Sequence, residues 1–350
     1  MRVMWRWLRR ALLALIAACL ALLAPVVWVE TACRPVGQEV ASRPILPPED
    51  HRPESRTLLT YPEWHIVHAY EDYARVIASG DPHDYRFVDG IAGFWGSLCT
   101  LSRASGTLGE VDGATRQMVH VIGVSFTAEL LLKAAYEETL GRLFAALRGQ
   151  VRAPLDDLSA DQAAAYAAFL QQTPWYRWDF RRDAKALLDA ATGRLRDRER
   201  TLALGLEYRA KAAYADVIAG AVAQAGADAL TLRMIVTGVD AQTLSAIDGV
   251  TVVAGRAQGV EIETPRYRAL TLLMQDLARR GVDFVEIAGN DRIMFTLLSP
   301  DPALPGALYS RARQGSDDTR HLVLVDVAQL GDRLRSLATG AARVEHIHDY

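Results

Sequence analysis

The first feature of the chain is an uncharged, apolar segment close to its start. Residues 11–29 carry no charge. As a helix rising about 1.5 Å per residue they would reach about 28 Å, close to the hydrocarbon thickness of a bilayer. Four arginines and no acidic residue come before the segment, namely Arg2, Arg6, Arg9 and Arg10. The pattern predicts a basic cytoplasmic tail at 1–10 and a transmembrane anchor at 11–29, with the rest of the chain exported.

Two other interpretations of this segment share its charge layout. A cleaved signal peptide needs small residues after its apolar core, and only Thr31, Ala32 and Cys33 offer them here. A lipoprotein signal would end at Cys19, but ten uncharged and mostly apolar residues follow that cysteine. All three interpretations export the remainder of the chain, and the uncleaved anchor fits the pattern best.

Cysteine usage is compatible with export. Outside the apolar segment the chain contains only Cys33 and Cys99. In an oxidising compartment a disulfide bond between them would tie the residues after the anchor to the first folded part. Spacing says nothing about geometry, so the alternative of two unpaired thiols stays open.

A proline-rich stretch and then a helical pattern follow the anchor. Residues 30–57 contain five prolines and no hydrophobic period, so we expect an extended linker that holds the folded part away from the membrane. The segment Thr60-Tyr61-Pro62-Glu63 predicts a capping box at the start of a helix. Helical periodicity continues through residues 58–228, which we predict to form an all-α helical bundle.

The stretch from Met118 to Leu147 is apolar nearly all round. This composition is typical of a helix at the centre of a bundle or of one embedded in a membrane. His120, Glu129 and Lys133 argue against a second membrane span.

The pattern changes near residue 230, where strands begin to alternate with helices. Segments 232–239, 250–253, 259–263, 283–288, 292–298, 321–327 and 343–348 predict strands, and 241–247, 265–280 and 328–337 predict helices. Gly289-Asn290-Asp291 between 283–288 and 292–298 predicts that these two strands form a β-hairpin. Residues 229–350 are therefore predicted to form an α+β domain with helices on one face of a mainly antiparallel sheet. The order of the elements is similar to that of ferredoxin-like domains.

Composition narrows the classes of function without naming one. Half of the 350 residues are hydrophobic and 23% are charged, which allows a sizeable core and excludes a wholly disordered chain. The net charge of -3 gives no reason to expect a nucleic-acid partner. The sequence lacks the signatures of HExxH zinc proteases, CxxC redox enzymes, common serine hydrolases and P-loop ATPases.

One candidate metal site lies on the first helix of the helical region. His65, His68 and Asp72 stand at positions i, i+3 and i+7 and therefore share a face. Two imidazoles and a carboxylate at this spacing suit zinc or a similar divalent ion. The aliphatic and tyrosine positions lie roughly opposite, so we expect the histidine face to point away from the primary core. A solvated polar face, or a contact with another domain or a partner, explains the same pattern.

A second candidate is a short pattern that occurs in two helices. Glu129-x-x-x-Lys133-Ala-Ala-Tyr136 recurs as Glu207-x-x-x-Lys211-Ala-Ala-Tyr214. In both copies glutamate precedes lysine by four residues, which is the favourable orientation for a helical ion pair. If the two helices face each other, four charges and two tyrosines would meet, either as a ligand pocket or as a structural ion-pair network.

The last residues of the chain form a third candidate. As a strand they would place His346, His348 and Tyr350 on one face, and two histidines at i and i+2 can bind a metal ion. An edge strand with an exposed polar face also explains this pattern. Nothing in the sequence places the strand near His65.

The sequence supports only a general expectation about the function of the protein. The sequence favours a single-pass inner-membrane protein that contacts the lipid bilayer through residues 11–29. Its exported domains would act as a binding or scaffold module for a protein or a small molecule. The alternative is a metal- or cofactor-dependent enzyme that uses the face of His65, His68 and Asp72.

Overall fold

The computed structural model of the chain describes residues 2–38, 43–109, 111–225 and 229–350. The α-helices are α1 (Arg2–Ala32), α2 (Arg56–Leu59), α3 (Tyr61–Ser79), α4 (Phe87–Ala104), α5 (Gly113–Tyr136), α6 (Arg142–Arg148), α7 (Pro154–Leu170), α8 (Phe180–Ala190), α9 (Leu195–Ala225), α10 (Ala241–Ser245), α11 (Tyr267–Arg279) and α12 (Val327–Leu337). The strands are β1 (Thr231–Thr237), β2 (Thr251–Arg256), β3 (Gly259–Pro265), β4 (Asp283–Ile287), β5 (Arg292–Ser299), β6 (Tyr309–Ala312), β7 (Thr319–Asp326) and β8 (Arg343–His348).

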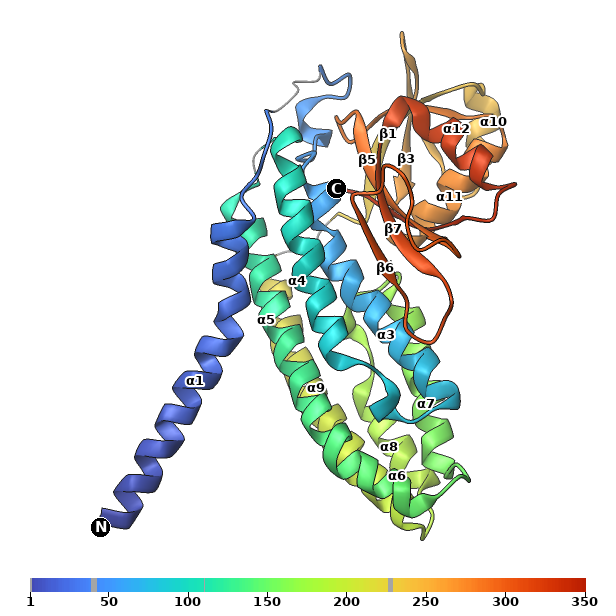
Figure 1. Cartoon of the computed structure of the whole chain (residues 1–350). Helices are drawn as coiled ribbons and strands as arrows, with labels where there is room; N and C mark the ends of the chain where they lie inside the picture. Colours follow the sequence, from blue (N-terminus) through green and yellow to red (C-terminus); the bar gives the residue numbers. More distant parts are fainter. Residues whose placement is uncertain (1, 39–42, 110, 226–228) are drawn as a thin grey trace.

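The N-terminal helix α1 meets the other helices only near its C-terminal end and diverges from them along the rest of its length (Figure 1). Its segment Trp5–Ala32 is long and apolar enough to cross a membrane, a test that a signal sequence also passes. At the end of the helix Val29 and Cys33 are buried against α4 and α5. Cys33 forms a disulfide bond with Cys99 of α4, which resolves the alternatives left by the sequence.

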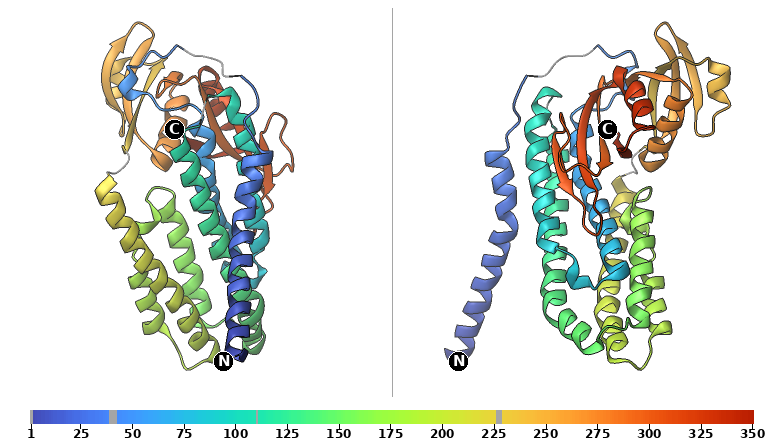
Figure 2. Two further views of the ribbon diagram at one scale, coloured as in Figure 1. Left: turned by 90° about the vertical axis from the view of Figure 1, so that its left-hand side faces the viewer. Right: turned by 45° about the vertical axis from the view of Figure 1, so that its right-hand side comes forward.

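Helices α3 to α9 form a bundle in which α3 packs against α4, α5 and α7 (Figure 2). Its core contains Tyr73, Phe94, Trp95 and Phe126. The stretch Gly113–Arg148, which joins α5 to α6 through a π-helical turn at Glu137–Gly141, is a second segment long and apolar enough to span a membrane. Core helices of soluble proteins meet the same criterion.

Helix α3 begins at Tyr61 as predicted, but the predicted capping box is wrong. Thr60 has helical backbone angles, and its hydroxyl donates to the carbonyl oxygen of Thr57 (3.2 Å) instead of capping α3. The reason is that α2 and α3 follow each other almost without a break, so the start of α3 is not a free helix end.

The described part of the expected linker does not form a free spacer. The Glu286 carboxylate accepts hydrogen bonds from the backbone amides of Ile45 (2.5 Å) and Leu46 (2.8 Å). The Glu54 carboxylate accepts one from the amide of Arg292 (2.8 Å). These hydrogen bonds hold residues 43–55 against the region of β4 and β5.

The C-terminal part contains two antiparallel four-stranded sheets where the sequence predicted one. Their strand orders are β2-β3-β1-β4 and β6-β7-β5-β8. If the strands of each sheet are numbered from 1 to 4 in chain order, both sheets have the order 2-3-1-4. Helix α11 packs on β8 and helix α12 on β4, so the last strand of each sheet contacts the helix of the other, and one hydrophobic core runs through both.

The hairpin predicted between 283–288 and 292–298 is also wrong. Its two strands, β4 and β5, belong to different sheets. Ala288 and Gly289 have positive φ angles (52° and 79°), and this tight turn passes the chain from one sheet to the other. Local turn chemistry resembles that of a hairpin, whereas the pairing of the strands is decided by distant segments.

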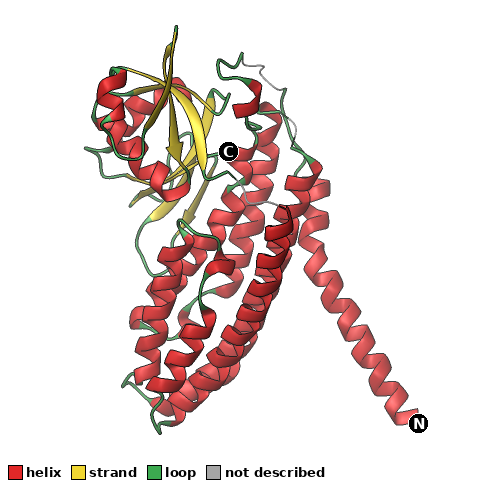
Figure 3. Ribbon diagram, turned by 180° about the vertical axis from the view of Figure 1, so that it is seen from behind, coloured by secondary structure: helices red, strands yellow, loops and turns green. Residues whose placement is uncertain are grey.

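The sheets lie at the end of the bundle where α1 joins it (Figure 3). There the second sheet covers α2, α3 and α4, with Tyr61 and Trp64 of α3 packed in one cluster with Met294 of β5 and Leu322 of β7. We call this contact, between α3 and the strands β7, β5 and β8, the seam.

Candidate functional site

The candidate metal-binding face of α3 is buried and does not point to solvent as expected. His68 lies in the seam, whereas the ring of His65 lies against Phe94 of α4 and Phe126 of α5. The exposed fractions of His65, His68 and Asp72 are 5%, 2% and 7%. The aliphatic and tyrosine stripe faces the bundle, and the opposite face is covered by the second sheet. A helix with two packing partners has two buried faces, and the periodicity of one apolar stripe reveals only the first.

His68 lies between two carboxylates from distant parts of the chain. Its Nδ1 is 3.3 Å from Oε2 of Glu71 on the same helix, and its Nε2 is 3.6 Å from Oε2 of Glu345 on β8. Ligand atoms of His68, Glu71 and Glu345 all lie within 4.8 Å of one another. The C-terminal strand, which the sequence could not place, therefore meets α3 at this histidine.

Arg320 of β7 holds Glu345 in position. Its Nε and Nη2 donate to the two carboxylate oxygens of Glu345 at 2.5 and 2.7 Å. Burial alone would raise the pKa of Glu345, but the charges of Arg320 and His68 outweigh it and hold this pKa far below the ordinary value. The pKa of Glu71 is also lowered, because the hydrogen bond with His68 and its charge outweigh the effect of burial. Both carboxylates are therefore ionised at neutral pH.

Two further histidine rings complete this part of the seam. The ring of His346 stacks on the Trp64 indole with centroids 3.4 Å apart, and the ring of His348 lies 5.5 Å from that of Tyr61. Burial, followed by the charge of neighbouring histidines, holds the pKa of both rings well below the ordinary value, so both are neutral. The predicted exposed polar face of this strand is thus wrong, because α3 and α11 cover it.

Four ring nitrogens in this cluster have no hydrogen-bond partner among the described residues. They are Nε2 of His68, Nε2 of His346 and both nitrogens of His348. The Nδ1 of His346 does have a partner, the hydroxyl of Thr271 at 3.0 Å. Buried polar atoms are nearly always paired, so four unpaired nitrogens in one place call for a physical explanation.

The other two predicted ligands, His65 and Asp72, are engaged elsewhere. The Nε2 of His65 bonds to the carbonyl oxygen of Gly90 (2.9 Å), and burial lowers the pKa of this ring to about 3. Asp72 accepts hydrogen bonds from Arg75 (2.9 Å) and from the backbone amide of Gln314 (3.1 Å). Of the three predicted ligands, the structure brings only His68 to the histidine and carboxylate cluster.

The repeated Glu–Lys pattern forms a crossed ion-pair network in which the four charges meet. Lys133 lies 3.1 Å from Glu207, while Lys211 lies 2.8 Å from Glu129 and 3.0 Å from Glu207. The Tyr70 hydroxyl donates to Glu129 (2.6 Å).

The predicted tyrosines do not join this network. Tyr136 donates to Glu199, and Tyr214 is 49% exposed and lies beside Trp175. The cavity that reaches Lys133 has a volume of about 10 Å³. That is barely the space of one water molecule, so the described network fits a structural role better than a ligand pocket.

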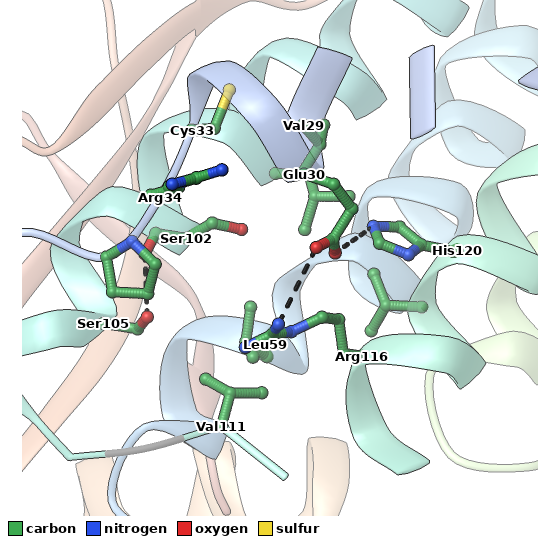
Figure 4. A pocket seen from close by; sticks show the side chains of 13 residues that line it. Val29, Glu30, Cys33, Arg34, Leu59, Ser102, Ser105, Val111, Arg116 and His120 are labelled. Carbon is green, nitrogen blue, oxygen red and sulfur yellow. Dashed lines mark hydrogen bonds and ion pairs between the residues drawn. The ribbon is translucent and has the colours of Figure 1, made fainter. Parts of the chain in front are cut away.

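A larger cavity, which the sequence did not predict, lies where α1 ends (Figure 4). Its volume is about 330 Å³, and residues of α1, α4 and α5 line it. Glu30 lies inside, 3.7 Å from Arg116 and 3.6 Å from His120. The only sequence signal was the pair of charged residues, Glu30 and Arg34, directly after the apolar segment.

Comparison of the chain with protein families, with characterised proteins and with solved structures finds no match. The function must therefore be inferred from the geometry of these three places.

Proposed function

We propose that the chain is a single-pass inner-membrane protein whose exported domains bind a divalent transition-metal ion at the seam. The anchor is supported by the exposed apolar length of α1 and by the four arginines that precede it. Export is supported by the Cys33–Cys99 disulfide bond beyond the other end of α1, because disulfide bonds form in oxidising compartments.

The observation that carries the metal site is the group of unpaired ring nitrogens beside two carboxylates. In a tetrahedral site with bonds of about 2.1 Å, neighbouring ligand atoms are about 3.4 Å apart. His68 Nε2 and Glu345 Oε2 are 3.6 Å apart, so little movement is needed to bind one ion. Glu71 accepts from Nδ1 of His68, which leaves Nε2 as the ligand, as in other carboxylate–histidine–metal arrangements. The neutral ring of His348, whose two nitrogens have no hydrogen-bond partner among the described residues, is the further ligand that we propose.

The ion pair with Arg320 is compatible with this site. A carboxylate offers about four lone-pair positions, and Arg320 uses two of them on Glu345. The guanidinium also compensates the buried charge of Glu345 when no ion is bound, which keeps the ligand set together. Nitrogen and oxygen ligands in this combination suit zinc, iron, manganese or copper.

For the C-terminal part we propose two ferredoxin-like units in tandem. The first unit runs β1-α10-β2-β3-α11-β4, and its antiparallel order β2-β3-β1-β4 supports this assignment. The second runs β5-β6-β7-α12-β8 in the equivalent order, with a proline-containing loop where the first unit has α10.

For the bundle we propose that the side formed by α5 adjoins the bilayer. Helix α5 lies on the same side as α1 (Figure 1) and exposes Val121 and Leu132, whereas α7 on another side exposes Asp161. In membranes, a cysteine introduced at Leu132 should react more slowly with a membrane-impermeant maleimide than one introduced at Asp161. Equal rates would refute this orientation.

The metal site is tested on the full chain, purified in detergent without a histidine tag. Elemental analysis should find about one equivalent of a transition metal, and Co²⁺ added to stripped protein should give the absorption bands of a tetrahedral site. Both signals should be lost in His68→Gln and in His348→Gln.

The matched control is His321→Gln. His321 is equally buried in the second sheet, but both of its ring nitrogens are hydrogen-bonded, to Ser299 at 3.0 Å and Ser310 at 2.8 Å. Metal binding should survive this substitution. A wild-type chain that binds no metal, or a control that loses metal as completely as the test variants, would refute the site.

A further inference from the structure

The cavity at the end of α1 has the size and the lining of a small-molecule site. Its volume of about 330 Å³ falls within the range of ligand pockets. Its apolar lining includes Leu59, Leu98 and Val119, and its charged or polar lining includes Glu30, Arg34, Arg116 and His120. Figure 4 shows Glu30 reaching toward Arg116 and His120, with Leu59 beside Arg116. Such a mixed lining suits a ligand that has both a charged and an apolar part.

The position of the cavity is set by α1. If α1 spans the bilayer, residues 29–34 lie where the helix leaves the outer leaflet. Val29, Glu30, Cys33 and Arg34 of this stretch line the cavity, and the disulfide bond of Cys33 fixes the stretch to α4. The cavity is therefore placed at the depth of the lipid headgroups, and this placement rests on the anchor proposed above.

The charges of the cavity favour an anionic group. Arg116 is 47% exposed, and its ion pair with Glu30 is long at 3.7 Å. Arg34 is exposed and has no hydrogen-bond or ion-pair partner among the described residues. Burial, only partly offset by the charge of Glu30, lowers the pKa of His120, so this ring is neutral. The charged groups of the cavity are therefore two arginines and one carboxylate. Guanidinium groups match the geometry of phosphate oxygens, and Glu30 leaves the site close to one net positive charge.

An apolar surface continues beneath the charged end. Val26 of α1 and Val124 of α5 are half-buried members of the hydrophobic cluster that includes Val29. Val26 comes one turn before Val29 along α1 and Val124 one turn after His120 along α5, so both extend from the cavity toward the proposed membrane span, where the first methylene groups of an acyl chain would run.

We propose that this cavity binds the phosphate headgroup of an anionic phospholipid of the outer leaflet. Arg34 and Arg116 hold the phosphate, and the apolar wall with Val26 and Val124 contacts the glycerol backbone and the start of one acyl chain. The lipid then fastens the folded part beside its own anchor.

The experiment is native mass spectrometry of the full chain in detergent, after removal of bound lipid. Phosphatidylglycerol, phosphatidylcholine and inorganic phosphate are added separately. We expect one phosphatidylglycerol per chain, held at least about tenfold more tightly than phosphatidylcholine, and no comparable retention of inorganic phosphate. The double variant Arg34→Gln/Arg116→Gln should lose this preference. Arg142→Gln should keep it, because Arg142 is exposed as well but pairs with Glu138 at the other end of the bundle from the cavity.

Equal retention of the two lipids, retention of inorganic phosphate as strong as that of phosphatidylglycerol, or an unchanged double variant would overturn the proposal. Two further readouts distinguish its failure from a failure of the proposed function. Carbonate extraction of membranes reports whether α1 anchors the chain, and metal content reports on the seam. A chain that is anchored but shows no lipid preference refutes the lipid site alone.

Discussion

The stability of the helical bundle should depend on Lys211 at neutral pH and much less in acid. Lys211 pairs with both Glu129 and Glu207, and Glu207 pairs in addition with Lys133. Burial alone would raise the pKa of Glu207, but the two lysines lower it to about 2. The ion pairs therefore stabilise the charged form of this glutamate strongly.

The size of the effect follows from this pKa. The difference between the pKa of Glu207 in the folded chain, about 2, and the ordinary glutamate pKa, about 4.3, corresponds to about 3 kcal/mol of free energy that favours the folded chain at neutral pH. The side chain of Glu207 is 22% exposed, so solvent screens the coupling only in part. Replacing Lys211 also removes the 2.8 Å partner of Glu129. Lys211→Met should thus lower the free energy of unfolding by about 3 kcal/mol at pH 7, as expected when one member of a buried pair is removed.

The dependence on pH has a definite sign. The pKa of Glu207 and of Glu129 is lower in the folded chain than in the unfolded chain. The two carboxylates therefore contribute fully to the free energy of unfolding above a pH of about 4.3, and this contribution is lost as the pH falls toward 2. In the Lys211→Met variant both carboxyl groups protonate more easily, so the difference between wild type and variant should shrink steadily below pH 5.

Urea unfolding of the full chain in detergent, followed by tryptophan fluorescence at pH 7 and pH 3, measures this difference. The control is Arg181→Met, which breaks a pair with Asp216 whose side chains are 67% and 60% exposed and should lower the stability far less than Lys211→Met does. If Lys211→Met lowered the free energy of unfolding equally at both pH values, the loss would come from packing and not from charge. A loss no larger than that of the control would refute the reasoning.

Other substitutions test the seam and the attachment of α1. A Cβ atom on Gly93 would lie 2.5 Å from a guanidinium carbon and 2.7 Å from an imidazole carbon, so Gly93→Ala should cost about 1–3 kcal/mol in thermal unfolding. Gly96→Ala, whose nearest neighbour is 3.5 Å away, should be tolerated. Arg320→Met leaves a buried glutamate unpaired and should cost about 3–5 kcal/mol in urea unfolding, while a loss below about 1 kcal/mol would contradict the pairing. Cys33→Ala/Cys99→Ala opens a loop of 66 positions and should cost about 4 kcal/mol, matching the loss that a reductant causes in wild type.

Local patterns predicted the elements of the fold well. The strand predicted at 343–348 coincides with β8, and that at 292–298 ends one residue before β5 does. The alternation of side chains within a strand, or the spacing along a helix face, is set by neighbours in the chain, so it can be seen in the sequence. Strand β6 could not be recognised from its pattern, because it has four residues and no buried side chain.

The division into two sheets could not be predicted in this way. Strand β1 pairs with β4 and strand β5 with β8, across intervals of about 50 residues. These pairings depend on which distant strands bury their apolar faces together. The turn at Ala288 and Gly289 has the composition of a hairpin whether or not the flanking strands pair.

The burial of the candidate residues could not be predicted, for a related physical reason. The spacing of His65, His68 and Asp72 showed that they share a helix face, but buried and solvated polar faces have the same sequence pattern. What distinguishes them is the partner, and Glu345 and His348 lie more than 270 positions away along the chain. The only indication in the sequence that the last strand is buried was its content of two histidines and one glutamate, because an edge strand exposed to solvent does not require so many imidazole groups.

The repeated Glu–Lys pattern, in contrast, also contains information about the direction of its two helices. If two helices carrying the same glutamate and lysine, four residues apart, pack in parallel, glutamate lies opposite glutamate and lysine opposite lysine. If they pack antiparallel, each lysine lies opposite the glutamate of the other helix. Like charges at this distance repel, so a shared pattern that meets in a bundle favours the antiparallel arrangement. Helices α5 and α9 run in opposite directions, and Lys133 with Glu207 and Lys211 with Glu129 form the two crossed pairs. The electrostatics of the pattern thus predicts the relative direction of two helices that are about 80 residues apart in the chain, which neither helix could show alone.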